Sequence, residues 1–379
     1  HLLAIMGLVH LQRAGHHPIA LVGGATGLIG DPSGKSAERN LLTLETAREN
    51  AEAIRAQLEP FLDFEAAGNP ARMRNNLDWL GKISLIDFLR DVGKHFSVNA
   101  MLRKESVKRR IEDEETGISF TEFSYQLLQA YDFARLCEDD ECTLQLGGSD
   151  QWGNITAGID LVRRLHGRDA HGVVFPLVTN SAGKKFGKTE AGAVWLDPAL
   201  TSPFRFYQFW INATDEDAGR YLRFFTLLDR AEIEALEAEH AEEPWKRVAQ
   251  KRLAEDVTGR VHGQDGLARA ERATAALFGG DLEGLGADEI ADVFSDVPSS
   301  DVPRTSLEGE GLGIVDLLAD AGVASSKGEA RRAVEGGGIY VNAVRVESVE
   351  TPVTLDHAIE GRFLVLRKGK KNYHLVRVD

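Results

Sequence analysis

One stretch of the chain changes from alternating to helical hydrophobic spacing at a pair of glycines. Leu144 and Leu146 alternate with polar neighbours, which is typical of a β-strand. Gly147 and Gly148 interrupt the alternation, and apolar residues then recur at helical spacing over residues 154–165. The pattern predicts a strand, a glycine turn and a helix, which together are half of a βαβ unit.

The turn of this unit is a candidate ligand site. Ligands of open α/β sheets bind at the carboxyl ends of parallel strands, and the two glycines would let the backbone approach a ligand closely. Ser149, Asp150 and Gln151 add a hydroxyl, a carboxylate and an amide at the rim of the turn. The alternative is that Asp150 only caps the following helix.

Elsewhere the hydrophobic pattern alternates between strands and helices. We expect helices over residues 2–14, 43–62 and 119–136, and strands over residues 19–22, 73–75 and 173–178. Residues 201–279 have mainly helical periodicity, and short strands are expected over residues 339–341, 344–346 and 363–366. Ser326 and Glu329 have the spacing of a capping box. The alternation predicts an α/β fold with a parallel sheet.

Length and composition indicate more than one domain. At 379 residues the chain exceeds one typical hydrophobic core. We expect a Rossmann-like α/β domain over residues 1–200, an α-helical domain over 201–280, a linker over 281–311 and a small α+β domain over 312–379. The linker is predicted from an acidic stretch that contains Pro298, Pro303 and pairs of serines.

Charge and cysteine content narrow the classes of function. The net charge of -15 argues against general affinity for polyanions, but the segment from Arg362 onward has six Lys or Arg and one acid. Two cysteines cannot form a four-thiolate zinc site and suit a reducing cytoplasm. No apolar run is long enough to span a bilayer, and nothing indicates export. Because the sequence opens with His1, we expect residues upstream of it.

A glycine-rich stretch at residues 23–36 resembles two phosphate-binding loops. A Walker loop requires a glycine five positions before Gly34, where Ile29 stands. The spacing G-x-x-G-x-x-G over residues 24–30 resembles that of short-chain dehydrogenases. Those enzymes need a Tyr-x-x-x-Lys pair, and none of the four tyrosines between residues 125 and 221 has a lysine four positions later. A NAD(P) enzyme is therefore a weakened alternative.

Three polar side chains share one face of the helix predicted over residues 119–136. Tyr125, Gln129 and Asp132 lie at positions i, i+4 and i+7, whereas apolar residues cover the opposite side. Each polar group would cost about 1–3 kcal/mol if it were buried without a partner. They must therefore satisfy one another or bind a ligand, and we favour a ligand.

A loop beyond the strand predicted at residues 173–178 carries lysines and a threonine between glycines. Lys185, Lys188 and Thr189 would place two ammonium groups and a hydroxyl on one loop. Such groups suit a polyphosphate undergoing transfer. A surface hairpin is the general alternative, but this loop is expected at the same sheet edge as the other two polar segments.

Together these motifs resemble the bacterial tyrosyl-tRNA synthetases, a family of class I aminoacyl-tRNA synthetases. The resemblance covers the whole chain, through HLLAIM, GLIGDPSGK, TEFSYQLLQAYD, GGSDQWGN, KFGKT and the basic tail. KFGKT resembles the class signature KMSKS, and His1 resembles the second histidine of the HIGH signature. The resemblance implies a Rossmann-like catalytic domain, an α-helical domain and a small α+β RNA-binding domain. It also implies a cytoplasmic homodimer, with Phe120 in the subunit contact.

The resemblance assigns roles around the amino acid tyrosine. Tyr125, Gln129 and Asp31 would hold its amino group, and Gln151 would reach its carboxylate. Asp132 would accept a hydrogen bond from the phenolic hydroxyl, which phenylalanine lacks. This family is itself the known example of such rejection.

The resemblance also implies ATP chemistry without a covalent enzyme intermediate or a prosthetic group. Tyrosine attacks the α-phosphorus of ATP, pyrophosphate leaves, and tRNA(Tyr) then takes the tyrosyl group. ATP and adenylate contacts are expected at His1, Gly147, Asp150, Leu177, Val178 and Lys188. Catalytic roles are expected for His1, Lys35, Arg39, Lys185, Lys188 and Thr189. Mg²⁺ would lie on the ATP phosphates, and no metal ligands are expected from the protein.

Contacts with tRNA phosphates are expected from basic residues near the site and in the last domain, and they would make charging sensitive to salt. These residues are Arg163, Arg164, Lys327, Arg331, Arg332, Lys368, Lys370 and Lys371. Two further readings stay open, a tryptophan enzyme of the same fold and an RNA-binding relative without enzymatic activity. The line of Tyr125, Gln129 and Asp132 favours a phenol over an indole.

Overall fold

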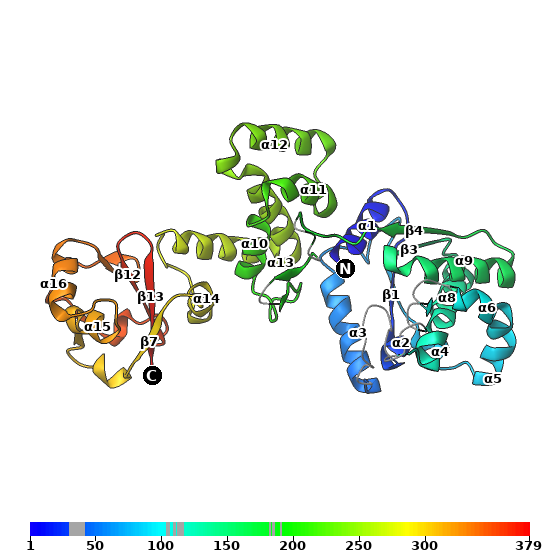
Figure 1. Cartoon of the computed structure of the whole chain (residues 1–379), viewed down its shortest axis with the longest axis horizontal. Helices are drawn as coiled ribbons and strands as arrows, with labels where there is room; N and C mark the ends of the chain where they lie inside the picture. The colour runs from blue at the N-terminus through cyan, green and yellow to red at the C-terminus, as the bar shows by residue number, and fades with distance from the viewer. Residues whose placement is uncertain are drawn as a thin grey trace. The chain divides into compact units, whose positions relative to one another are not determined.

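The computed structural model describes residues 1–29, 42–103, 107–108, 111, 117–181, 183, 186–189 and 192–379, with the side chains of residues 188 and 189 left out. The chain divides into two compact units (Figure 1). The first comprises His1–Ala191 and Arg220–Asp229, and the second comprises Gly192–Gly219 and Arg230–Asp379. Each unit is described by itself.

The first unit is built on two parallel strand pairs. β1 (Ile19–Val22) pairs with β2 (Arg72–Asn75), and β3 (Leu144–Gly148) pairs with β4 (His171–Phe175). β1, β2 and β3 begin and end within two residues of the predicted positions, whereas β4 begins two residues and ends three residues before the predicted range of 173–178. The parallel pairing confirms the predicted α/β class, because parallel strands require crossover connections such as the helices seen here.

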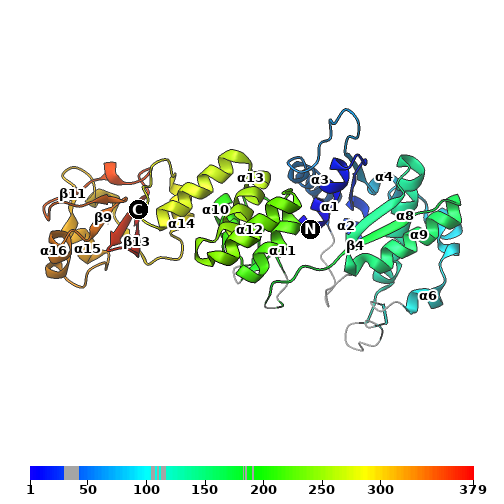
Figure 2. The same ribbon diagram turned by 90° about the horizontal axis from the view of Figure 1, so that it is seen from above.

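Two long helices cover the β3–β4 pair. α8 (Phe120–Asp140) and α9 (Trp152–His166) lie side by side next to these strands (Figure 2). Ser119 and Glu122 form a complete capping box that begins α8. Gly158 of α9 permits the close approach of the helices, since a Cβ there would lie 2.9 Å from the ring of Phe133.

The remaining elements of the first unit are short except for two helices. The predicted helices over 2–14 and 43–62 are found as α1 (Leu2–Arg13) and α3 (Leu44–Leu58), the latter capped by Thr43. The others are α2 (Gly24–Ile29), α4 (Leu77–Leu80), α5 (Leu85–Asp87), η1 (Phe88–Val92), η2 (Gly93–His95), α6 (Val98–Leu102), η3 (Ser149–Gln151) and β5 (Lys188–Thr189).

The second unit begins with helices, as the sequence predicts. These are α10 (Pro203–Ile211), α11 (Asp215–Phe225, whose last six residues belong to the first unit), α12 (Arg230–Glu242), η4 (Pro244–Lys246) and α13 (Val248–Leu277). β6 (Gly192–Ala193) precedes them. α10 packs along α13, which is interrupted at Gly263 (φ 72°, ψ 176°). Glycine tolerates this left-handed φ without strain.

A five-stranded sheet forms the C-terminal part of the second unit, in the order β10-β9-β12-β13-β7. Its strands are β7 (Ser299–Val302), β9 (Ile339–Val341), β10 (Val344–Arg345), β12 (Phe363–Lys368) and β13 (Asn372–Val378). Around it lie η5 (Arg304–Ser306), β8 (Leu312–Gly313), α15 (Ile314–Asp320), α16 (Lys327–Glu335), β11 (Pro352–Val353) and η6 (Leu355–His357).

The central strand β12 is buried on both faces. Leu364 and Leu366 face the core formed with α15 and α16, whereas Phe363 and Val365 face a second core formed with α13 and α14 (Ala287–Val293). Successive residues of a strand point to opposite faces. The uninterrupted apolar run of this strand therefore follows from packing on both sides.

The prediction of a linker over residues 281–311 is wrong. α14 and β7 both lie in this stretch, and β7 pairs in parallel with β13. Leu285, Ile290 and Phe294 are buried in the core that includes Phe363. Although the stretch is acidic overall, it has enough apolar residues at regular intervals to bury one face of α14 and of β7.

The predicted capping box at the start of α16 forms in part. The Ser326 hydroxyl accepts a hydrogen bond from the Glu329 backbone N–H at 3.2 Å. The Glu329 carboxylate turns instead to the backbone N–H and hydroxyl of Ser325, at 2.9 and 2.5 Å. Among the described residues, no helix combines the length and apolarity needed to cross a membrane.

Candidate active site

Asp132 is the most enclosed polar side chain of the predicted site. It projects from α8, is 3% exposed, and accepts hydrogen bonds from Asn76 Nδ2 at 3.0 Å and Trp79 Nε1 at 2.7 Å. Burial raises the pKa of the Asp132 carboxyl to about 6, and the two hydrogen bonds oppose that effect. One donor on each oxygen leaves the carboxylate able to accept a further hydrogen bond.

Asn76 fixes the geometry around Asp132. It follows β2 directly, is 1% exposed, and also donates to the Thr26 hydroxyl at 3.0 Å. Its side-chain oxygen accepts the backbone N–H of Ala25 at 2.8 Å. The amide thus links the ends of β1 and β2 to α8, and the orientation of Asp132 depends on this link.

Neither Asn76 nor Trp79 was predicted from the sequence. The signal was present, since Asn75 and Asn76 stand at the end of a predicted strand. The same rule that selected the turn after β3 would have selected them.

A chain of amides connects α8 to the turn after β3. Asn154 Nδ2 donates to Gln129 Oε1 at 2.9 Å and to Gln151 Oε1 at 3.2 Å, and Gln151 Nε2 donates to Asp150 Oδ2 at 3.3 Å. The structure therefore brings the predicted residues Gln129, Gln151 and Asp150 together. The linking residue, Asn154, was not predicted to have a role.

The alternative role of Asp150 as a helix cap is not found. The N-cap of α9 is Gln151, and it makes no side-chain capping hydrogen bond. Asp150 is exposed at the rim of the turn, and a Cβ on Gly148 would lie 2.4 Å from Asp150 Oδ1 and 3.7 Å from Leu177. The tight contact is with Asp150 in the same turn, whereas Leu177 of the segment after β4, 53% exposed, is at ordinary contact distance.

The structure also describes the predicted residues Tyr125, Gly147 and His1. Tyr125 is half-buried on α8, one turn before Gln129. Gly147 packs closely, with Gln151 and Ile155 3.1 and 3.2 Å from the position of an added Cβ. His1 is exposed and stands at the N-cap of α1.

The loop that carries KFGKT, residues 179–189, is here called the signature loop. The backbone N–H of Phe186 donates to the carbonyl of Val178 at 2.9 Å, which closes the loop. The Phe186 ring stacks on Phe225, and Arg220 Nη2 donates to the carbonyl of Thr179 at 2.5 Å. Lys188 and Thr189 form β5. The predicted residues Asp31, Lys35, Arg39 and Lys185 lie outside the described residues.

The predicted tRNA contacts differ in how their charges are balanced. In the first unit, Arg163 pairs with Asp160 at 2.7 Å, and Arg164 is exposed beside it. In the second unit, Lys327 pairs with Asp316 at 2.7 Å and Lys368 pairs with Glu329 at 2.6 Å. The exposed members of the second unit include Arg331, Arg332, Lys370 and Lys371.

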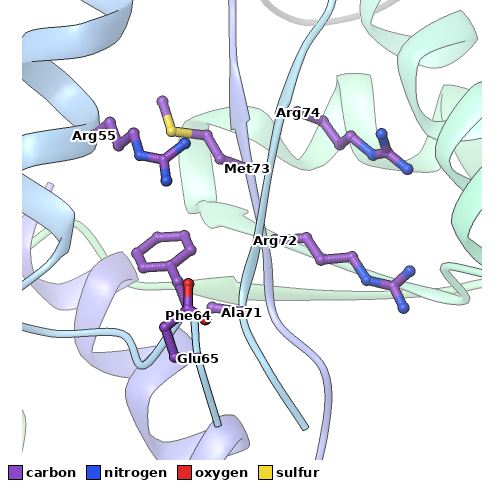
Figure 3. A pocket seen from close by; sticks show the side chains of 7 residues that line it. All are labelled: Arg55, Phe64, Glu65, Ala71, Arg72, Met73 and Arg74. Atoms are coloured by element: carbon purple, nitrogen blue, oxygen red, sulfur yellow. The ribbon is translucent and has the colours of Figure 1, made fainter.

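A separate pocket lies between α3 and β2, and none of the predicted site residues lines it (Figure 3). Its lining consists of Arg55, Phe64, Glu65, Ala71, Arg72, Met73 and Arg74. Figure 3 shows the side chains of Arg72 and Arg74 directed away from Arg55. Both pair with Asp140, at 3.1 and 2.6 Å. Because Arg72 and Arg74 point to Asp140 and not towards Arg55, the three guanidinium groups do not surround a common point in the pocket. The pocket therefore does not form an anion site.

Within the part of the chain that the structure describes, no group of three or more His, Cys, Asp or Glu side chains could hold a metal ion. The two cysteines, Cys137 and Cys142, are free thiols.

Comparison with known families identifies relatives along the whole chain. The family model described as tRNA synthetases class I (W and Y) matches residues 1–279, and a model of the SYY-like tyrosine--tRNA ligase C-terminal domain matches residues 289–376. The second match begins inside α14, which agrees with a folded segment in place of the predicted linker.

Individual relatives are similar at high identity. A tyrosine--tRNA ligase of Roseiflexus castenholzii is 59% identical over 378 residues, which cover 100% of this chain and 89% of the relative. One of Geobacillus stearothermophilus is 56% identical over 378 residues, covering 88% of its length. A solved structure, a C-terminally truncated mitochondrial tyrosyl-tRNA synthetase of Aspergillus nidulans, has a TM-score of 0.65 and 30% identity. The match covers 73% of this chain and 81% of that structure.

Proposed function

The chain belongs to the family of class I tRNA synthetases for tryptophan and tyrosine, and we infer that it joins L-tyrosine to the 3' end of tRNA(Tyr). The tyrosine carboxylate attacks the α-phosphorus of ATP, and the bond to the leaving pyrophosphate breaks. A terminal hydroxyl of the tRNA then attacks the tyrosyl carbonyl and releases AMP. Because the first nucleophile is already an anion, neither a side-chain base nor a covalent enzyme intermediate is required.

The buried carboxylate of Asp132 carries the proposal for tyrosine as the amino acid. Asn76 and Trp79 hold both of its oxygens, and a phenolic hydroxyl could donate to the remaining acceptor sites. A substrate without that hydroxyl would leave a buried acceptor unpaired. Gln129, fixed by Asn154, lies one turn earlier on the same helix and suits the amino end of the substrate, together with Tyr125 and Asp31.

We propose that ATP binds at the turn after β3 and the signature loop. Asp150 would accept hydrogen bonds from the ribose hydroxyls, and Gln151 would reach the tyrosine carboxylate. Leu177 and Val178 would line the adenine pocket, with Gly147 allowing the adenylate to approach the backbone. The proximity of Asp150 and Leu177 at Gly148 supports this arrangement.

Stabilisation of the departing pyrophosphate is proposed for five residues that can carry positive charge and for the hydroxyl of Thr189. The five are His1, Lys35, Arg39, Lys185 and Lys188. Their work would be to align the phosphates and to neutralise the charge that grows on pyrophosphate. Mg²⁺ would enter on the phosphates as part of the ATP complex, without a protein site of its own.

We further propose that the C-terminal sheet binds tRNA phosphates. The exposed residues Arg331, Arg332, Lys370 and Lys371 are the best candidates, because their charges are open to solvent. Lys327 and Lys368 each face a carboxylate, so their contribution would require exchange of that partner for a phosphate. Arg163 and Arg164 would guide the acceptor end in the first unit.

A homodimer in the cytoplasm completes the proposal. Exposed apolar side chains occur on four elements of the first unit, α5, η1, α6 and α8, and the last three contribute buried residues to one core. The exposed residues are Leu85, Ile86, Leu89, Val98 and Phe120, each 49–79% exposed. Isolated exposed apolar residues are normal, but a contiguous group marks an interaction surface. Free thiols at Cys137 and Cys142 suit a reducing compartment.

Exchange between ATP and labelled pyrophosphate tests the proposal. Tyrosine should support exchange, and tryptophan and phenylalanine should support it at least about a hundred-fold less efficiently. Exchange with tryptophan alone would identify the sister enzyme. Binding of NAD(P) without exchange would favour a dehydrogenase, and RNA binding without exchange would favour a non-enzymatic relative.

A further inference from the structure

Three aromatic rings join the signature loop to the end of α11. The Phe186 ring stacks on Phe225, with centroids 4.9 Å apart and an interplanar angle of 13°. It meets Tyr221 edge-on, at 5.0 Å and 65°. Tyr221 and Phe225 are 4% and 1% exposed, so burial restricts the positions of their rings. Phe186 is therefore held by a rigid surface.

Arg220 provides a second attachment one residue earlier on the same helix. Its Nη2 donates to the carbonyl of Thr179 at 2.5 Å, at the first residue of the loop. The guanidinium also lies over the Tyr221 ring, 5.5 Å from its centroid. Since Phe186 N–H donates to Val178 O, the two ends of the segment 178–186 are tied to each other and to α11.

We propose that Arg220, Tyr221 and Phe225 are positioning residues for the activation of tyrosine. They touch neither substrate; they act by holding Phe186 and Thr179. Phe186 lies between Lys185 and Lys188 in the chain, and Thr179 follows Val178, so one helix end controls the backbone on both sides of the loop. This inference rests on the proposed role of the signature loop in binding the ATP phosphates.

The physical reason is the sensitivity of in-line transfer to geometry. Displacement of a phosphate-binding group by about 1 Å can reduce a rate on the order of a hundred-fold. Stacked and edge-on rings constrain both the distance and the tilt of the Phe186 side chain. Loss of an ordinary core contact would lower the stability of the fold only, whereas loss of a positioning contact would lower kcat/KM for ATP.

The experiment compares Phe186→Ala, Phe225→Ala and the double variant in ATP–pyrophosphate exchange. We expect each single variant to lower kcat/KM for ATP about ten-fold or more, with the dissociation constant for tyrosine changed less than two-fold. The double variant should be no worse than the more affected single variant, because both changes remove one contact. Phe186→Tyr, which keeps the ring, should restore most of the activity.

Control variants separate positioning from folding. Phe206, in α10, is 1% exposed and meets Trp210 edge-on at 6.0 Å, so Phe206→Ala should lower the Tm without changing kcat/KM for ATP in the folded enzyme. If Phe225→Ala fails to fold, two other variants test the same attachment. Phe186→Ala removes the ring contact from the side of the loop, and Arg220→Met removes the hydrogen bond to the carbonyl of Thr179.

Two outcomes would overturn the inference. Phe186→Ala and Arg220→Met could both leave kcat/KM for ATP unchanged, or Phe186→Ala and Phe225→Ala could give fully multiplicative losses. Failure of the proposed function would look different, since the unaltered chain would then show no tyrosine-dependent exchange, or Lys185→Ala would have no effect on it.

Discussion

Replacing Trp79 by phenylalanine would test the role of Asp132 directly, because it removes one hydrogen-bond donor and keeps an aromatic ring. Trp79 Nε1 donates to Asp132 Oδ1 at 2.7 Å, and Asp132 is 3% exposed. A hydrogen bond to a charged group contributes about 1.5–3 kcal/mol. That contribution favours the ionised form of Asp132, so Trp79→Phe should destabilise the ionised form selectively.

The consequence should appear in the pH dependence of tyrosine activation. Burial raises the pKa of Asp132 to about 6 in the unaltered chain, although Asn76 and Trp79 lower it. Without the indole donor the pKa should rise further, by about one pH unit or more on the same energy scale. At pH 7, kcat/KM for tyrosine in pyrophosphate exchange should fall about two-fold in Trp79→Phe if the pKa rises by one unit, and about ten-fold if it rises by two. It should recover towards the unaltered value above pH 8.

Ionisation of Asp132 should also change the stability of the fold. Stability should decrease as pH rises, whereas the rate of tyrosine activation should increase. The folded pKa of about 6 is above the ordinary aspartate pKa of 3.8, so the folded chain binds more protons than the unfolded chain between these values. The contribution of Asp132 to stability therefore decreases as pH rises through that window, by roughly 3 kcal/mol in total. Urea unfolding of the unaltered chain and Asp132→Asn at pH 4.5 and 8 would measure it.

Two results would refute this reasoning about Asp132. One is a tyrosine kcat/KM that is flat between pH 5 and 8 in the unaltered enzyme. The other is a plot of kcat/KM for tyrosine against pH in which Trp79→Phe and the unaltered enzyme have their inflection at the same pH. The KM for ATP serves as the internal control and should not change, because Trp79 contacts the group proposed to bind the phenol.

Other changes test the remaining parts of the proposal. Lys185→Ala should slow tyrosine activation by about 3 kcal/mol in the transition state, roughly a hundred-fold, with unchanged tyrosine affinity; an unchanged single-turnover rate would exclude this role. Charge reversal of Lys370 and Lys371 should weaken tRNA binding and lower the slope of log affinity against log salt by about two, while pyrophosphate exchange stays normal. Phe120→Asp should shift sedimentation towards a monomer at micromolar concentration, and an unaltered dimer would contradict the proposed contact surface.

The sequence predicted local features of the fold well because local chemistry determines them. Ser119 and Glu122 specify the start of α8, whereas the glycines predicted to break the strand after Leu146, Gly147 and Gly148, are the last two residues of β3. Periodicity also placed Gln129 and Asp132 on one face of α8. These features depend on residues a few positions apart, where helical and strand spacing apply directly.

Contacts between distant segments could not be predicted in the same way. Asn76 and Asp132 are 56 positions apart, and a single sequence does not say which strand end meets which helix. The linker was predicted wrongly because composition was weighed above the spacing of Leu285, Ile290 and Phe294. The contact of Phe186 with Phe225 was not predicted either, because a loop has no periodic pattern from which the partner of an aromatic residue could be inferred.

The hydrogen bonds of α8 suggest how selection and activation are coupled in this enzyme. Asp132 is bound by Asn76 at the end of β2, whereas Gln129 is bound by Asn154 beside the turn after β3. The two strand pairs therefore meet the same helix through side chains three positions apart. A substrate that pairs correctly with Asp132 would be aligned by the same helix with Gln129, Gln151 and Asp150, where ATP is proposed to bind. A misfit at the phenol would consequently cost binding and also displace the carboxylate from the α-phosphorus, so discrimination should appear in kcat as well as in KM.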